Sequence, residues 1–131
     1  MIPLNQWHTE LGNRRKHIWQ IAQEAGCDIA LVYSSREHPE PFRYLTNFVP
    51  ALGDMWGLLS SPEAMTCVLN FHWELNEASQ VSGVHDWHGY FDPTPFLQER
   101  LSSHKPERIA VLGLHRMPWG MYTWLRDTLG A

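Results

Sequence analysis

Apolar residues near the start of the chain repeat with the spacing of one helix face. From Asn5 to Ala25 they fall at positions 7, 11, 18, 21, 22 and 25, and the aliphatic stem of Arg14 can lie along the same stripe. Gly26 supplies a stop signal, so we expect a helix over residues 5–25. Trp19 falls off this stripe. An exposed tryptophan of that kind indicates docking, which makes Trp19 a candidate for an interface with another domain or subunit.

Short apolar runs bounded by turn-forming residues follow this helix and are typical of strands. Residues 28–35 (DIALVYSS) are apolar throughout after the first position, which predicts a strand buried on both faces. The Pro and Ser residues of SSPEA favour a tight reversal, so the runs on either side of it should form an antiparallel hairpin. The remaining strands are expected at residues 55–61 (MWGLLSS), 65–71 (MTCVLNF), 84–90 (VHDWHGY) and 108–114 (RIAVLGL).

Three further helices are expected between and after these strands. One covers residues 73–81 and ends at Gly83, and a second is capped by Asp92 or Thr94, each of which precedes a proline. A last helix starts near Pro118 and places four apolar residues on one face: Met121, Trp124, Leu125 and Leu129. The element order predicts an α/β domain with a layered mixed sheet of about five or six strands, one antiparallel hairpin and helices on both faces.

Composition narrows the classes of partner. The chain has 131 residues, a net charge of −4 and no basic run longer than RRK at positions 14–16, so we expect no nucleic-acid partner. No apolar stretch approaches the roughly 20 residues of a membrane span, so we expect no membrane partner. Cys27 and Cys67 each lie in an apolar run, which favours free thiols and a cytoplasmic location.

Local clusters of reactive side chains do not build a catalytic site. His85, Asp86 and His88 form the most metal-like group, but in a strand His85 and His88 point to opposite faces and cannot share an ion. Neither cysteine lies in an electropositive, accessible setting, and there is no G-x-S-x-G elbow or phosphate-binding glycine loop. We therefore expect no catalytic residue, no metal and no cofactor in this chain.

Several segments, in order along the chain, resemble the amino-terminal domain of the creatinase, prolidase and aminopeptidase P family. They are HIWQIAQEAGCDIALVY, RYLTNF, GLLSSPEAMTCVL, DWHGYFDPTPFLQERL and ERIAVLGLHRMPWGMYTWL. The resemblance implies that residues 1–131 form a single α/β domain with a ribonuclease H-like motif, the amino-terminal part of a longer chain whose pita-bread catalytic domain is absent. That missing domain would hold two divalent metal ions (Mn, Co or Zn) and cleave Xaa-Pro bonds, although the creatinase branch does without metal.

The resemblance also assigns candidate site residues. In the family the segment matching RYLTNF lies at the domain junction, near the active-site cleft of its own or a neighbouring subunit. This implies a cleft-edge role for Phe42, Arg43, Tyr44, Asn47 and Phe48. Asn47 stands where glycine is frequent, and asparagine tolerates a left-handed backbone. The alternative for this segment is a loop whose rings simply cap the end of the sheet.

Two hypotheses for function follow. In the first, the chain is the non-catalytic amino-terminal domain of an Xaa-Pro dipeptidase or aminopeptidase. It would dock onto the carboxy-terminal catalytic domain, support a homo-oligomer and shape substrate access. In the second, it is a free-standing α/β module that binds a protein or a ligand without catalysis. The two hypotheses differ in whether the sheet has an open edge after the last helix: such an edge would favour the first, because an exposed edge is a liability for a free-standing protein.

Overall fold

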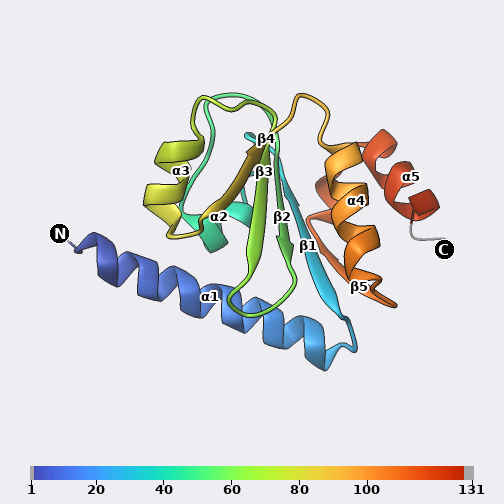
Figure 1. The fold of residues 1–131 in the computed structure, drawn as a ribbon, viewed down its shortest axis with the longest axis horizontal. Coiled ribbons are helices and arrows are strands. Elements are labelled where there is room, and N and C mark those ends of the chain that lie inside the picture. Colours follow the sequence, from blue (N-terminus) through green and yellow to red (C-terminus); the bar gives the residue numbers. More distant parts are fainter. Residues whose placement is uncertain (1, 129–131) are drawn as a thin grey trace.

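The computed structural model describes residues 2–128, which fold around one five-stranded sheet (Figure 1). Its strands are β1 (Ile29–Ser34), β2 (Met55–Leu59), β3 (Met65–Leu69), β4 (Asp86–Gly89) and β5 (Ile109–Leu112). Its helices are α1 (Leu4–Glu24), α2 (Phe42–Thr46), α3 (Leu75–Ser82), α4 (Thr94–His104), α5 (Trp119–Thr128) and the short 3-10 helix η1 (Leu114–Arg116). Every strand and helix predicted from the pattern is present, and α2 and η1 are additional.

The strand order is β4-β3-β2-β1-β5, and β2 alone runs against its neighbours. The predicted hairpin is confirmed, because β2 and β3 pair antiparallel with Met55 opposite Leu69 and Leu59 opposite Met65. The carboxyl ends of β1, β3, β4 and β5 therefore meet at one edge of the sheet, which we call the carboxyl edge. Among the described residues no strand pairs with the outer side of β5, so β5 is an edge strand.

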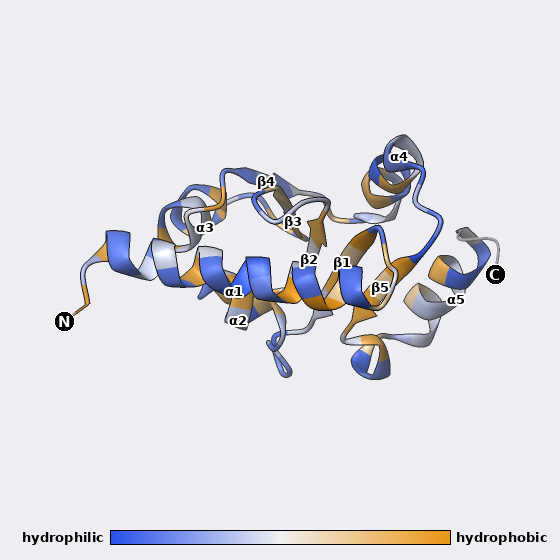
Figure 2. Cartoon of the chain, turned by 90° about the horizontal axis from the view of Figure 1, so that it is seen from below, coloured by the Kyte–Doolittle hydropathy of each residue, from blue (hydrophilic) through white to orange (hydrophobic). Residues whose placement is uncertain are grey.

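Helices cover both faces of the sheet, as predicted. Alternate residues of β1 point to opposite sides, so that Ala30 and Val32 face α1, α2 and α3, whereas Leu31 and Tyr33 face α4 and α5. All six residues of β1 are buried, which confirms the strand predicted to be covered on both faces. Figure 2 shows the contrast between hydrophobic strands and the mostly hydrophilic helix α1, which passes in front of them in this view.

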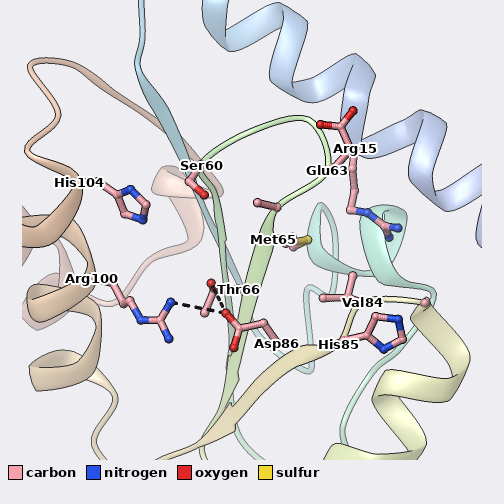
Figure 3. Close-up of a pocket in the computed structure, with 12 residues that line it drawn as sticks. Arg15, Ser60, Glu63, Met65, Thr66, Val84, His85, Asp86, Arg100 and His104 are labelled. Atoms are coloured by element: carbon pink, nitrogen blue, oxygen red, sulfur yellow. Dashed lines mark hydrogen bonds and ion pairs between the residues drawn. The ribbon is translucent and has the colours of Figure 1, made fainter.

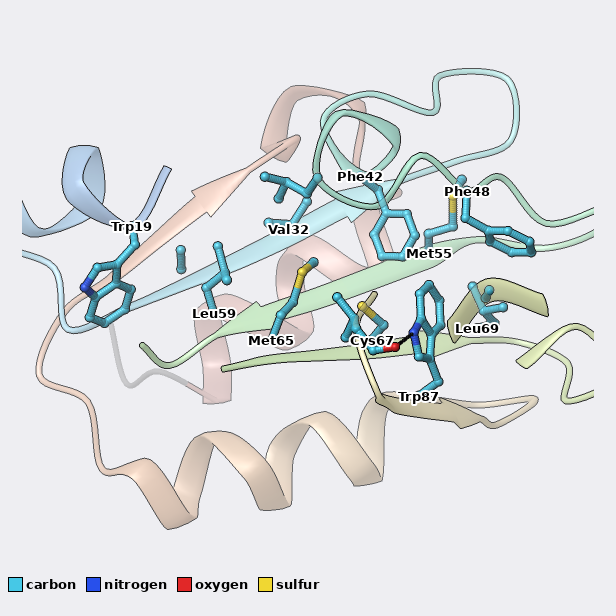
Figure 4. Packing of buried hydrophobic residues seen from close by; sticks show 14 of the residues in the cluster. Trp19, Val32, Phe42, Phe48, Met55, Leu59, Met65, Cys67, Leu69 and Trp87 are labelled. Carbon is cyan, nitrogen blue, oxygen red and sulfur yellow. Dashed lines mark hydrogen bonds between the residues drawn. The ribbon is translucent and has the colours of Figure 1, made fainter. Parts of the chain in front are cut away.

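The buried face of α1 differs from the predicted stripe by about one residue. Its buried residues are Leu11, Arg15, Trp19 and Ala22, which also have helical spacing. The expectation that Trp19 is exposed is wrong, because its side chain is 7% exposed and packs in the core beside β1 and β2 (Figure 4). The interface role inferred for Trp19 rested on that exposure. Ile21, assigned to the buried stripe, is instead exposed.

The ends of the other helices follow the expected chemistry. Gly83 ends α3 with φ of 73°, a left-handed conformation that glycine adopts without strain. At the start of α4, the Asp92 carboxylate accepts hydrogen bonds from the Thr94 amide at 3.1 Å and from its hydroxyl at 2.7 Å. Leu129, predicted on the buried face of the last helix, lies outside the described residues.

Candidate functional site

The segment from Phe42 to Phe48, for which a loop was the alternative interpretation, contains the five-residue helix α2. Its first amide, on Phe42, donates to the Ser34 hydroxyl at the end of β1 at 3.0 Å. The Glu40 carboxylate accepts from the Tyr44 amide at 3.0 Å, as expected of an acid beside a helix amino end. These contacts satisfy amides that would otherwise lack partners, so one turn of helix can follow a proline-rich loop directly.

The two phenylalanines of the segment face the core. Phe42 is fully buried and Phe48 is 6% exposed. Their rings lie edge-on to Trp87 of β4, with ring-centroid distances of 5.8 and 5.9 Å (Figure 4). The Trp87 indole N–H donates to the Val84 carbonyl at 2.9 Å, so its polar end is satisfied although the ring is buried. These two rings therefore fill the layer between the sheet and α2, and neither is available at the surface of this chain.

The three polar candidates of the segment lie at the surface. Arg43 forms an ion pair with Glu40 at 2.7 Å, and about half of each side chain is exposed. Tyr44 is 39% exposed, and the Arg14 guanidinium lies 4.9 Å from the centre of its ring. Asn47 ends α2 with φ of 55°, which confirms that asparagine sustains the left-handed turn here. The five candidates thus divide between core and surface, and a cleft-edge role stays a prediction for Arg43, Tyr44 and Asn47.

Sequence reasoning missed Arg15, which holds the segment in place. Its side chain is 9% exposed, and its guanidinium donates to the Leu45 carbonyl at 2.9 Å and to the Ser82 carbonyl at 3.4 Å. These carbonyls are near the carboxyl ends of α2 and α3, where a positive charge is favourable. Burial lowers the pKa of Arg15, although an arginine stays protonated in proteins. The signal in the sequence was its spacing of four residues from both Leu11 and Trp19.

A cleft of about 330 Å³ lies at the amino ends of β3 and β4, between α4 and the β2–β3 turn (Figure 3). At its floor the Asp86 carboxylate accepts from the Thr66 hydroxyl and from His88 Nε2, both at 2.6 Å, and faces Arg100 at 3.5 Å. Burial opposes ionisation of Asp86, but these three partners outweigh it and lower its pKa. The Asp86 carboxylate therefore links β3, β4 and α4 through these contacts.

The cluster of His85, Asp86 and His88 does not assemble a metal site. His85 precedes β4 and is exposed, whereas His88 lies within the strand, with its ring tilted against Phe96 of α4 at a centroid distance of 4.5 Å. Across residues 2–128, no three His, Cys, Asp or Glu side chains are placed to hold a metal ion. The residues present therefore do not fit the pair of ions that the resemblance implies for a catalytic domain.

The cysteines lack the features of a nucleophile. Cys67 is fully buried on β3, and burial raises the pKa of its thiol, which disfavours the reactive thiolate. Cys27 is half-buried, and both cysteines are free thiols, as predicted.

Of the helices in the described part of the chain, none has the length and apolar character needed to cross a membrane.

Sequence reasoning also missed a group of aromatic rings at the carboxyl edge, most of them exposed. We call Phe71, Trp73, Tyr90 and Phe91, which follow β3 and β4, the aromatic edge. Phe91 is 84% exposed and Trp73 is 58% exposed. Phe71 stacks on Trp73 with ring centroids 4.6 Å apart and contacts Phe91 edge-on at 6.3 Å. The sequence separates these rings by about 20 residues, and the parallel pairing of β3 with β4 brings them together.

Comparison with solved structures identifies proteins of the same fold. A Xaa-Pro dipeptidase from Bacillus anthracis matches 95% of this chain with a TM-score of 0.67 and 15% identity. A proline dipeptidase from Streptococcus pneumoniae TIGR4 matches 90% of this chain and 86% of its own, with a TM-score of 0.70 and 19% identity. The amino-terminal domain of the cytoplasmic peptidase PepQ from Mycobacterium tuberculosis H37Rv matches 91% of this chain and 86% of its own, with a TM-score of 0.68 and 13% identity.

These matches differ in how much of the other protein they cover. This chain spans 32% of the length of the Bacillus anthracis dipeptidase, whereas it spans most of the other two structures. No family model matches the sequence, and no curated protein does. The likeness therefore resides in the three-dimensional arrangement: the chain has the fold of the amino-terminal domains of Xaa-Pro dipeptidases, as its resemblance to the creatinase and prolidase family predicted.

Proposed function

We propose that this chain is the non-catalytic amino-terminal domain of an enzyme similar to the Xaa-Pro dipeptidases. The observation that carries the proposal is the fold match, which extends over at least 90% of this chain in each of the three structures described. The parent would be a cytoplasmic dipeptidase or aminopeptidase, with two divalent ions (Mn, Co or Zn) in a following catalytic domain. This domain would contribute docking, oligomerisation and substrate access.

Two features of the exposed surface favour a domain that is partly covered by other parts of a larger parent protein. Trp73 and Phe91 both expose their rings and both contact Phe71, and a contiguous apolar patch on a protein surface usually marks an interaction site. The edge strand β5 also leaves one side without a partner strand within residues 2–128. A free-standing protein would normally protect such an edge, so both features favour the domain hypothesis over the independent module.

The size and activity of the natural protein test this proposal. Antibody raised against this chain should capture a polypeptide several times heavier than 15.2 kDa, as measured by intact mass. The captured protein should hydrolyse Xaa-Pro dipeptides when Mn²⁺, Co²⁺ or Zn²⁺ is added, whereas the 131-residue chain should not. The control is the same assay on Xaa-Ala dipeptides, which a proline-specific enzyme cleaves poorly.

A captured polypeptide of 15.2 kDa would overturn the proposal. It would favour the alternative, a free-standing α/β module that binds a protein or ligand without catalysis. A heavier protein without Xaa-Pro hydrolysis would retain the domain assignment and exclude the dipeptidase and aminopeptidase branches.

Docking through the aromatic edge can be tested by one substitution in two settings. In the isolated chain, Phe91→Ser should change the free energy of unfolding by no more than about 0.5 kcal/mol, because the ring is 84% exposed. In the parent, where the ring would be covered, the same change should cost about 2 kcal/mol. Urea denaturation measures the change in both settings.

Leu4→Ser is the matched control for docking. Leu4 is 54% exposed at the start of α1, so its replacement should be nearly neutral in both settings. Equal effects of Phe91→Ser in the isolated chain and in the parent would contradict docking through the aromatic edge.

A further inference from the structure

A second cavity lies at the carboxyl ends of β1 and β5. Its volume is about 590 Å³, within the range of roughly 300–1,000 Å³ that small-molecule sites occupy. One wall is the loop that follows β1, residues 37–41, and the other is the segment that follows β5, residues 112–116. The cavity therefore lies between two chain segments that are separated by about 75 residues in the sequence.

The topology of the sheet explains why a crevice opens at this point. Strands β1 and β5 are parallel neighbours, but the chain leaves them toward opposite faces. After β1 it enters α2, which packs on the face covered by α1 and α3, and after β5 it enters α5, which packs beside α4. Adjacent parallel strands whose connections diverge in this way leave a crevice beyond their carboxyl ends, where α/β proteins commonly bind ligands.

Gly113 allows the second wall to form. Its φ is 87°, and a Cβ atom at this position would collide with the Tyr33 carbonyl oxygen on β1. Glycine therefore lets the backbone turn sharply against β1, and the Arg116 amide then donates to the Gly113 carbonyl at 3.1 Å to close η1. The turn places Arg116 opposite the first wall, where its guanidinium donates to His38 Nε2 at 3.3 Å.

The lining combines an apolar wall with opposite charges. Pro39, Pro41 and Leu112 supply apolar surface. Arg116 has one guanidinium nitrogen directed to His38, and no carboxylate of residues 2–128 lies within ion-pair distance of it. Guanidinium groups pair with carboxylates through two parallel hydrogen bonds, so Arg116 is suited to a ligand carboxylate.

Two acidic residues and a second histidine also line this cavity. The Glu40 carboxylate is already engaged, because it accepts from Arg43 and from the Tyr44 amide. Glu37 is exposed and makes no ion pair within the described residues, so it offers a negative charge to a ligand. His115 lies beside Arg116 and adds a further polar group at the rim.

We propose that this crevice binds a small apolar amino acid as its zwitterion, with the ligand carboxylate on Arg116, its ammonium group toward Glu37 and its side chain against Pro39, Pro41 and Leu112. A simple carboxylate would gain the arginine but meet the repulsion of Glu37. A simple amine would gain the attraction of Glu37 but meet the repulsion of Arg116. Only a ligand with both groups matches both charges, so the two charges select the class of ligand.

Leucine is the probe, titrated into the ¹⁵N-labelled 131-residue chain while amide chemical shifts are followed. We expect amide shifts confined to the non-proline residues of segments 37–41 and 112–116. Arg116→Gln should weaken leucine binding at least tenfold. Glu37→Gln should also weaken leucine binding but should strengthen binding of 4-methylpentanoate, which lacks the ammonium group.

The matched control is Arg126→Gln, an exposed arginine on α5 outside the cavity, which should leave leucine binding unchanged. Arg116→Gln and Arg126→Gln both replace exposed arginines, and thermal unfolding will show that each variant remains folded. The proposal is overturned if leucine shifts residues elsewhere or causes no shift, or if Arg116→Gln and Arg126→Gln have equal effects. It is also overturned if Glu37→Gln weakens the binding of both ligands. This test uses no peptidase activity, so its outcome is separate from that of the proposed function.

Discussion

Replacing Trp87 by alanine should lower the free energy of unfolding by about 4 kcal/mol, the largest effect that we expect from one substitution. The Trp87 side chain is 9% exposed and contacts both Phe42 and Phe48 edge-on. Its removal would leave a cavity between β4 and α2, and it would also release the hydrogen bond to the Val84 carbonyl. Urea denaturation followed by far-ultraviolet circular dichroism measures the change.

Trp119→Ala provides the control for Trp87, because it removes the same side chain from an exposed position. Trp119 is 72% exposed, and within residues 2–128 its ring stacks only on Tyr122 of the same helix. Its replacement should change the free energy of unfolding by no more than about 0.5 kcal/mol. Similar losses for the two variants would mean that the layer of rings around Trp87 does not stabilise the fold in the way described.

Replacing Arg15 by methionine should cost about 3 kcal/mol of stability. Methionine can fill the space of the aliphatic stem, but it cannot donate to the carbonyls of Leu45 and Ser82, which accept from the guanidinium at 2.9 and 3.4 Å. Two carbonyls at the ends of α2 and α3 would then be buried without this partner, and such acceptors carry a desolvation cost. The measurement is again the midpoint and slope of urea denaturation.

Lys16→Met tests whether the loss belongs to the buried contacts or to any cation on α1. Lys16 is the next residue along the helix and is exposed, so its replacement should be nearly neutral. Arg15→Lys should give an intermediate loss, since a single ammonium group matches two separated carbonyls less well than a guanidinium. Equal stability of Arg15→Met and Lys16→Met would contradict the role assigned to Arg15.

These two substitutions concern how the Phe42 to Phe48 segment is held, which also bears on its function. Its rings are anchored from the sheet by Trp87 and its carboxyl end is anchored from α1 by Arg15. With both sides fixed, Arg43, Tyr44 and Asn47 are displayed on a well-supported surface. Such support is what a binding edge requires, because side chains held in place lose less entropy when a partner binds.

The sequence by itself determined the order and type of the five strands and of the helices other than α2 and η1. The apolar run of β1, the hairpin around SSPEA and the stop at Gly83 each depend on residues within a few positions of one another. Local propensity and periodicity report such features directly. The left-handed turn at Asn47 was implied by the resemblance, in which glycine is frequent at this position, and asparagine can adopt the same conformation.

Helix faces and short helices were less certain from the sequence. The pattern of α1 fitted two adjacent stripes, and charge made Arg15 look like a surface residue. The structure buries Arg15 and Trp19 together because the guanidinium finds carbonyl partners on α2 and α3. Likewise α2 forms where breakers predicted a loop, because Ser34 and Glu40 satisfy its first amides. Both outcomes depend on partners that local patterns do not contain.

Only the tertiary structure decided which distant segments meet. The pairing of β1 with β5 joins residues 80 positions apart, Ile29 and Ile109 among them, and it creates the crevice beyond their carboxyl ends. The pairing of β3 with β4 gathers the aromatic edge from two loops. Strand neighbours are chosen by long-range packing of whole faces, whereas the sequence pattern records only which face of each element is apolar.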